Sequence, residues 1–171
     1  NANDAIAMGT DAIVRGERGI AIGHHAVVAH GAHDSVAIGD GAEANQLNAT
    51  AIGVRSVANG LGAVSVGQCA NAQGSNATAF GANVLAIGVN TYSAGTNTEA
   101  NGVNAFATGT NSEARGTNAF ASGTNAEANG FNVYATGINA EANGSNAFAS
   151  GINTLALGSN IIATGIDAAA C

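Results

Sequence analysis

The densest group of side chains able to do chemistry in this sequence is a run of histidines near the N-terminus. The stretch HHAVVAHGAHD holds His24, His25, His30 and His33 beside Asp34. Imidazoles at this density could bind zinc or respond to acid pH. The stretch does not contain the HxxxH spacing of paired zinc ligands. The four histidines are therefore candidate metal ligands, but exposed turn residues are the interpretation we prefer, and the sequence predicts no cofactor.

Carboxylates recur at a fixed spacing in the C-terminal half of the chain. Glu99, Glu113, Glu127 and Glu141 follow one another every fourteen residues. Such a column could face a ligand or bind cations. The alternative, which we prefer, is a solvated face whose charge blocks unwanted association.

Catalytic chemistry is not indicated by any other motif. The sequence has no Ser–His–Asp context and no paired carboxylates, and its glycines do not form a GxGxxG phosphate loop. Cys69 and Cys171 would lie roughly 35 Å apart if seven coils of a stacked structure separate them. That distance is far beyond disulfide reach, so we expect no bond between them within the chain. The sequence predicts a protein that is not an enzyme.

Composition excludes further classes of function. Of 171 residues, 9% are charged, 25 are glycine and none is proline or tryptophan, and the net charge is −7. Only Arg15, Arg18, Arg55 and Arg115 could meet a phosphate, so we expect neither nucleic acid nor anionic lipid as a partner. The 46% hydrophobic content is mostly alanine, which buries little area, so an ordinary globular core would be thin.

A seven-residue repeat organises these residues. Glycine stands at every seventh position from Gly53 to Gly165, and asparagine follows two residues later from Asn76 to Asn160. Upstream, the steps to Gly31 and Gly39 are eight residues long, and Gln46 replaces a glycine. Single-residue insertions at turns would explain the longer steps. We therefore expect one domain, residues 1–171, with irregular coils over 1–46 and regular repeats over 47–171.

Each seven-residue unit predicts one short strand and one turn. A coiled coil is rejected because it needs large apolar residues in its seam, and each glycine in a helix costs roughly 1 kcal/mol. In GTNAFASG, Ala119 and Ala121 alternate with Phe120 and Ser122, as in a strand. Gly-x-Asn is turn chemistry. Repeated strand–turn units give a solenoid of stacked parallel strands, along which the asparagines are expected to bond to one another.

The full repeat is fourteen residues long. The position three before glycine alternates between aromatic and acidic residues, as in Phe106, Glu113, Phe120 and Glu127. Each coil therefore has two strands whose alanines fill the interior, with one aromatic and one acidic outer face. An aromatic column with a spacing of about 4.8 Å is an apolar patch that soluble monomers avoid. We expect copies of the chain to bury it through these residues: Ile22, Val36, Ile38, Ile52, Val64, Val66, Phe80, Tyr92, Phe106, Phe120, Tyr134, Phe148 and Ile162.

Several units resemble a known family. DSVAIGDGAEAN (34–45) and NATAIGVRSVANG (48–60), followed by the GxNAxAxG series, are similar to the YadA-like head of trimeric autotransporter adhesins. The resemblance implies an all-β, left-handed parallel β-roll, a homotrimer, and display on the outside of a Gram-negative bacterium. It also implies attachment to host cells, extracellular matrix or other bacteria. Ser35, Val36 and Ile38 of the SVAIG motif, with the four glutamates, are the candidate ligand-binding residues.

Anchoring would require other regions of a longer protein. The sequence begins without the charged-then-apolar run of a signal peptide, and no stretch approaches eighteen apolar residues. We therefore expect this part to be held at the outer membrane without inserting into it directly.

Two non-adhesive alternatives stay open. One is a passive spacer of a surface fibre. The other is an ice-binding solenoid, because a regular hydroxyl column could order water; its members are Thr108, Ser122, Thr136, Ser150 and Thr164. The oligomeric state separates ice binding from adhesion, since an ice-binding face must stay open.

Overall fold

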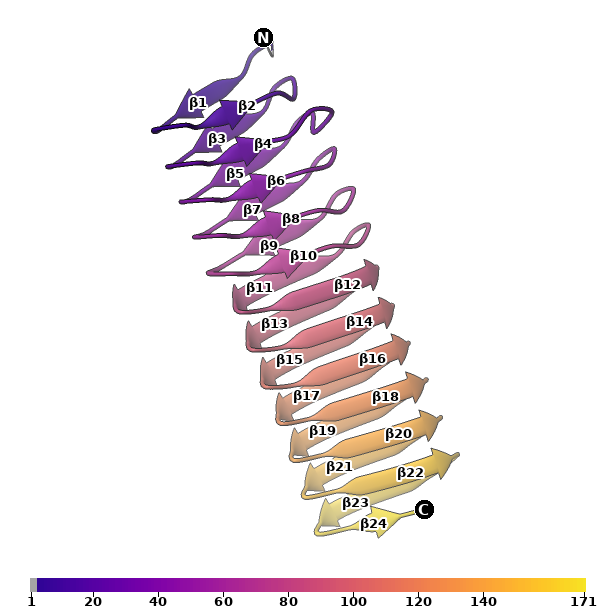
Figure 1. The fold of residues 1–171 in the computed structure, drawn as a ribbon. Coiled ribbons are helices and arrows are strands. Elements are labelled where there is room, and N and C mark those ends of the chain that lie inside the picture. Colours follow the sequence, from indigo (N-terminus) through magenta and orange to yellow (C-terminus); the bar gives the residue numbers. More distant parts are fainter. Residues whose placement is uncertain (1–2) are drawn as a thin grey trace.

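Two parallel sheets lie back to back and form a stack of twelve coils (Figure 1). The computed structural model describes residues 3–171, so the first two residues of the segment 1–46 lie outside the described residues. Within residues 3–171 there is no helix. The expected all-β solenoid with two strands per coil is confirmed.

Odd-numbered strands form one sheet, which we call the aromatic sheet, and even-numbered strands form the other, the acidic sheet. The aromatic sheet contains β1 (Ile6–Met8), β3 (Ile20–Ile22), β5 (Val36–Ile38), β7 (Thr50–Ile52), β9 (Val64–Val66), β11 (Thr78–Ala82), β13 (Tyr92–Thr96), β15 (Phe106–Thr110), β17 (Phe120–Thr124), β19 (Tyr134–Ile138), β21 (Phe148–Ile152) and β23 (Ile162–Ile166). The acidic sheet contains β2 (Ile13–Val14), β4 (Val27–Val28), β6 (Glu43–Ala44), β8 (Val57–Ala58), β10 (Asn71–Ala72), β12 (Leu85–Val89), β14 (Glu99–Val103), β16 (Glu113–Thr117), β18 (Glu127–Phe131), β20 (Glu141–Ser145), β22 (Leu155–Ser159) and β24 (Ala169–Ala170).

Strand register places equivalent residues of successive coils on top of one another. Phe106 pairs with Phe120 in the aromatic sheet, and Glu113 pairs with Glu127 in the acidic sheet. From β11 to β23 each strand has five residues, whereas β1 to β10 have two or three. Every side chain of the repeat is therefore part of a column along the stack.

The interior of each coil is filled by alanine, as the alternating pattern predicts. Ala119, Ala121, Ala126 and Ala128 are fully buried, while Phe120 and Glu127 between them point outward and are half-buried. Because alanine is small, the two sheets pack closely and each buried side chain contributes little area. The stability that the alanine core provides therefore depends on the number of stacked coils.

Buried hydroxyl pairs interrupt the alanine core, a feature that the alternating sequence pattern does not predict. The Ser56 hydroxyl lies 2.9 Å from the hydroxyl of Ser65, and the Ser93 hydroxyl donates to Thr98 Oγ1 at 2.9 Å. A buried hydroxyl needs a hydrogen-bond partner, and here it finds one on the facing strand or turn. These pairs therefore connect the two sheets through the core.

Stacking explains the repeating glycine better than turn conformation alone. Gly116 has a φ of +123°, and a Cβ atom built on it would lie 2.0 Å from the carbonyl oxygen of Gly130 in the next coil. The left-handed residue of that turn is Asn118, with a φ of +56°. Glycine is therefore required because backbone contacts backbone, and asparagine supplies the left-handed turn residue.

Asparagine side chains form a hydrogen-bonded ladder along each of the two turn columns. Asn104 Nδ2 donates to Asn118 Oδ1 at 3.2 Å, and Asn118 Nδ2 donates to Asn132 Oδ1 at 2.9 Å. The second ladder ends where Asn153 Nδ2 donates to Asp167 Oδ1 at 2.8 Å. The expected bonding between stacked asparagines is confirmed.

The irregular spacing near the histidines has a different origin from the one expected. Ile20 pairs with Val36, an offset of sixteen residues. A Cβ on Gly16 would lie 2.1 Å from the Ala32 carbonyl oxygen, so Ala32 occupies the glycine position of its coil. His30 and Gly31 are thus two extra residues in one turn, and the expectation of separate single-residue insertions was wrong.

Cys69 and Cys171 are both free thiols, as the separation argument predicts. Within residues 3–171, no helix is long and apolar enough to cross a membrane.

Candidate functional site

A continuous column of stacked rings runs along the outer face of the aromatic sheet. Tyr92, Phe106, Phe120, Tyr134 and Phe148 follow one another with ring centroids 4.5–4.9 Å apart. Their planes are within 12° of parallel, because the parallel register repeats the same side-chain geometry in each coil. In the single chain Tyr92 and Tyr134 are exposed, and the three phenylalanines are half-buried.

Aliphatic side chains extend this apolar face toward the N-terminus. All thirteen residues expected to face another copy lie on the outer face of the aromatic sheet. Phe80 stands in the column next to the ring stack, in register with Val66 and Ala94, and is 55% exposed. The apolar face is therefore two columns wide in the N-terminal coils and narrows to the ring stack after Phe80.

Exposed apolar side chains also line both edges of the roll, in addition to the residues predicted from the sequence. They occupy the position after the repeating glycine: Val89, Val103 and Phe131 on one edge, and Ile138, Ile152 and Ile166 on the other. The signal was present in the sequence, because a residue directly after a turn glycine cannot reach the interior of the coil. The apolar surface thus extends beyond the sheet face.

The hydroxyl column beside the rings forms hydrogen bonds within itself. Thr108 Oγ1 donates to Ser122 Oγ at 3.1 Å, and Thr136 Oγ1 donates to Ser150 Oγ at 3.1 Å. These four hydroxyls are half-buried next to the aromatic column. The donors of Thr108 and Thr136 are thus used within the column and are not available to order water.

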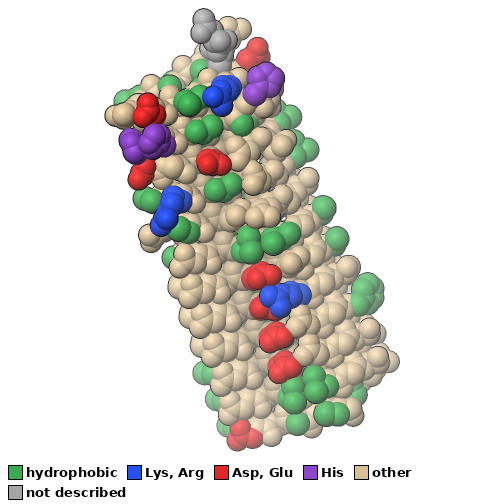
Figure 2. Space-filling model, viewed as in Figure 1, with side chains coloured by type: hydrophobic (Ala, Val, Ile, Leu, Met, Phe, Trp, Pro, Cys, Tyr) green, Lys and Arg blue, Asp and Glu red, His purple; other side chains and the backbone are tan. Residues whose placement is uncertain are grey.

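The acidic sheet carries the glutamate column on the opposite face (Figure 2). Its carboxylates are held by their own neighbours: Asn129 Nδ2 donates to Glu127 Oε1 at 2.5 Å, and Arg115 pairs with both Glu99 and Glu113. Apolar pairs stand one coil before and one coil after the column, namely Leu85 with Ile87 and Leu155 with Leu157. The acidic stripe is thus a bounded surface of four coils.

Burial raises the pKa of Glu113 above its usual value; Arg115 opposes this shift, and the carboxylates of Glu127 and Glu99 add to it. Folded Glu113 therefore binds its proton more tightly than the unfolded chain does. This contribution to stability is gained as pH falls through the folded-state pKa, and it is lost as pH rises.

We expect the melting temperature of the native chain, relative to that of Glu113→Gln, to rise as pH is lowered from 7 toward 4. The comparison with the variant is needed because Asp34 responds in the opposite sense. Thermal melts of both proteins at matched ionic strength measure the difference. A difference that falls on acidification would show that the carboxylate of Glu113 is not destabilised by burial.

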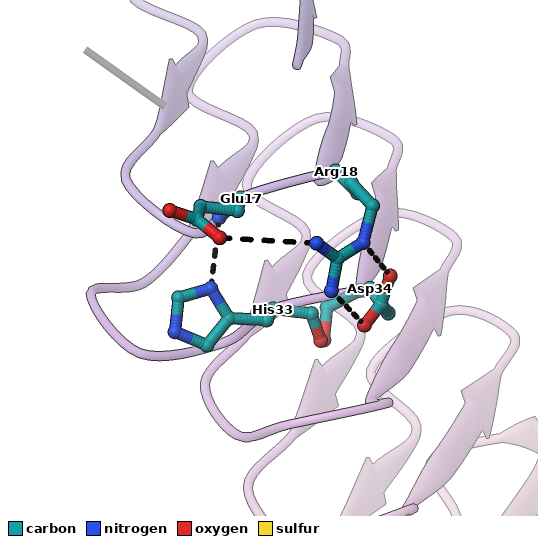
Figure 3. Close-up of polar contacts among 5 residues, drawn as sticks. Glu17, Arg18, His33 and Asp34 are labelled. Carbon is teal, nitrogen blue, oxygen red and sulfur yellow. Dashed lines mark hydrogen bonds and ion pairs between the residues drawn. The ribbon is translucent and has the colours of Figure 1, made fainter. Parts of the chain in front are cut away.

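A polar network joins two turns near the N-terminus (Figure 3). Arg18 donates to both carboxylate oxygens of Asp34, at 2.5 and 2.7 Å, and the Glu17 backbone N–H donates to His33 Nδ1 at 3.0 Å. The hydrogen bond from Arg18 lowers the pKa of Asp34 below its usual value. The network is solvent-exposed, so we expect it to fix the position of the insertion and to add little stability.

The four candidate histidines do not form one cluster. His24 and His25 lie in the turn between β3 and β4, whereas His30 and His33 lie in the turn between β4 and β5 on the other edge of the roll. Asp34, next to His33 in sequence, is paired with Arg18. The structure therefore does not place the four histidines around one ion.

The candidate ligand-binding residues also fall on separate surfaces. Ser35 is fully buried, and its hydroxyl lies 2.8 Å from the carbonyl oxygen of Gln46 and 3.1 Å from that of His33, so a ligand at the surface cannot touch it. Val36 and Ile38 lie on the aromatic sheet, and the glutamates lie on the acidic sheet. In residues 3–171 no pocket is present, and the candidate surfaces are the open faces and edges of the roll.

Comparison with known families gives one assignment. The YadA head domain repeat matches residues 1–26, 32–56, 58–83, 86–112, 114–130 and 135–160. No curated protein matches the chain at a significant level. The matched segments run along the stack from β1 to β22, and together they cover most of the sequence. The chain therefore belongs to the YadA head family, a family of structural adhesin domains exposed on the bacterial surface and not a known family of enzymes.

Proposed function

We propose that this chain is the adhesive head of a bacterial surface fibre and that it works as a homotrimer, with the aromatic sheets facing a common axis. The observation that carries the proposal is the partly exposed ring stack from Tyr92 to Phe148, continued by aliphatic side chains toward the N-terminus. An apolar stripe that runs along most of a stack is rarely left in water.

The exposed edges of the roll support a closed ring of copies. In a cyclic assembly each chain meets two neighbours through different surfaces. The sheet face of one chain and the edges carrying Phe131 and Ile152 would then be covered together. The YadA head family is known to form trimers, which sets the number of copies in the proposal at three. The left-handed winding expected from the family resemblance stays a prediction.

The acidic sheet faces outward in this arrangement and offers the surface for attachment. Its targets are host cells, extracellular matrix or other bacteria, and the head is held at the outer membrane through other regions of the protein. Binding would use the repeated column of carboxylates and amides, with many weak contacts in parallel and three copies per head.

Sedimentation equilibrium of the purified chain tests the assembly first. We expect a single species of about three times 16.4 kDa. A stable monomer at micromolar concentration would contradict the proposal, because the apolar stripe would then be open to solvent.

Adhesion is tested separately with the trimer coupled to beads and presented to matrix-coated surfaces, host cells and bacteria. Attachment that bare beads do not show would support the adhesive role. A trimer that binds none of these surfaces would contradict that role and favour the passive spacer.

A further inference from the structure

Two histidines and an aspartate meet on one edge of the roll, away from both sheet faces. Asp11 lies in the turn between β1 and β2, and His24 and His25 lie in the turn of the next coil, between β3 and β4. One ligand atom from each of the three side chains lies within 4.8 Å of the other two. All three side chains are exposed to solvent.

Asp40, in the following turn, orients one of the two imidazoles. His24 Nδ1 lies 2.9 Å from Asp40 Oδ1, a distance at which Nδ1–H donates to the carboxylate. That tautomer leaves the lone pair on Nε2 free. A carboxylate that holds one ring nitrogen while the other binds an ion is the usual support of a metal-binding histidine.

The side chains of His25 and Asp11 lie close together but do not form a hydrogen bond with each other. His25 Nδ1 lies 3.9 Å from Asp11 Oδ2, too far for a hydrogen bond. Two donors on one tetrahedral zinc ion are separated by about 3.4 Å when each bond is about 2.1 Å long. Small rotations of exposed side chains are therefore sufficient to place an ion between them.

We propose that Asp11, His24 and His25 form a surface site for a divalent transition-metal ion of the zinc class, with Asp40 as the residue that positions His24. Two imidazoles and one carboxylate suit zinc, copper or nickel better than calcium or magnesium, which prefer oxygen ligands alone. Three protein ligands leave at least one coordination position open, and its exposure makes it accessible to a ligand from outside the chain.

The other two histidines do not belong to this site. His30 lies in the two-residue insertion on the opposite edge, and His33 Nδ1 accepts the hydrogen bond from the Glu17 backbone. They therefore provide a matched control, with the same residue type in the same part of the chain.

Isothermal titration calorimetry with zinc chloride tests the site, in a Cys69→Ser/Cys171→Ser background so that free thiols do not compete. We expect one zinc ion per chain. The variants His24→Ala, His25→Ala and Asp11→Asn should each weaken binding at least tenfold, and Asp40→Asn by about 10- to 100-fold. The His30→Ala/His33→Ala control should bind as the parent does. X-ray absorption of the zinc-loaded parent should show only nitrogen and oxygen ligands at about 2.0–2.1 Å.

All four substituted side chains are exposed in turns, so we expect each variant to keep the fold. Circular dichroism of each variant checks this. The absence of saturable zinc binding by the folded parent would overturn the proposal. So would binding that survives His24→Ala and His25→Ala, or binding that is lost in the His30→Ala/His33→Ala control. The test does not depend on trimer formation or adhesion, so the site and the proposed function can fail separately.

Discussion

Replacement of Gly116 by alanine is expected to destabilise the stack by roughly 3 kcal/mol or more, from backbone strain and overpacking together. The added Cβ would lie 2.0 Å from the Gly130 carbonyl oxygen, and the backbone at Gly116 has a φ of +123° that L-residues rarely adopt. Neither coil can move away alone, because each is hydrogen-bonded to the next. Chemical denaturation followed by circular dichroism measures the loss.

Gly165→Ala is the matched control for this substitution. Gly165 has nearly the same conformation, with a φ of +119°, but no atom lies within 4 Å of its Cβ position. Only the conformational part of the penalty, about 1–3 kcal/mol, should remain. Equal losses in the two variants would mean that contact between glycine backbones of successive coils is not what requires glycine.

Phe120→Glu is expected to abolish trimer assembly, while each separate chain keeps its folded stack of coils. Phe120 lies in the middle of the ring column, 4.8 Å from Phe106 and 4.5 Å from Tyr134 between centroids. In the proposed trimer three new carboxylates would meet near the axis without cations, and an unpaired buried charge costs several kcal/mol. Sedimentation equilibrium over a range of concentrations should show a shift from trimer to monomer, and a lower melting temperature should accompany it.

Glu127→Phe makes the corresponding change on the acidic sheet, one strand further along the chain. This variant should keep the trimeric mass but aggregate more readily, because an aromatic ring replaces a half-buried carboxylate on the outward face. If Phe120→Glu remained a trimer of native thermal stability and Glu127→Phe remained as soluble as the parent, the assignment of the two faces would be wrong.

Much of the architecture could be predicted because each residue type of the repeat has one structural role. The alternation of Phe120 with Glu127 in equivalent positions is sufficient to define two outer faces, and the buried Ala119 and Ala121 follow from the strand period of two. The asparagine ladder follows from the same argument. The reason for glycine was only half predicted, since the approach of Gly116 to Gly130 depends on the distance between coils, which the sequence does not display.

The insertion shows why local spacing was misleading near the N-terminus. Gly31 falls where a repeat glycine could stand, so the count of residues between glycines gives two steps of eight. In the structure Ala32 takes the stacking position, and Gly31 belongs to a longer turn with a φ of +81°. The pairing of Ile20 with Val36 and the approach of Gly16 to Ala32 reveal this, and both are long-range contacts between coils.

The metal-site candidates were partly within reach of the sequence. Asp11 and His25 are one fourteen-residue coil apart, so their neighbourhood follows from the period alone. The contact of His24 with Asp40 does not, because it spans the sixteen-residue coil. Histidine density in the sequence pointed to the right segment, but topology divides that segment between two edges.

The strict alternation of strands between two sheets has a consequence for how such a head changes in length during evolution. Gain or loss of fourteen residues adds or removes one whole coil and leaves every downstream column in place. Loss of seven, such as residues 123–129, would instead move Tyr134 to the acidic sheet and Glu141 to the aromatic sheet, together with all later coils. Gene duplications and deletions in this family should therefore survive selection in even numbers of seven-residue units. The length of the head should then change in steps of one fourteen-residue coil.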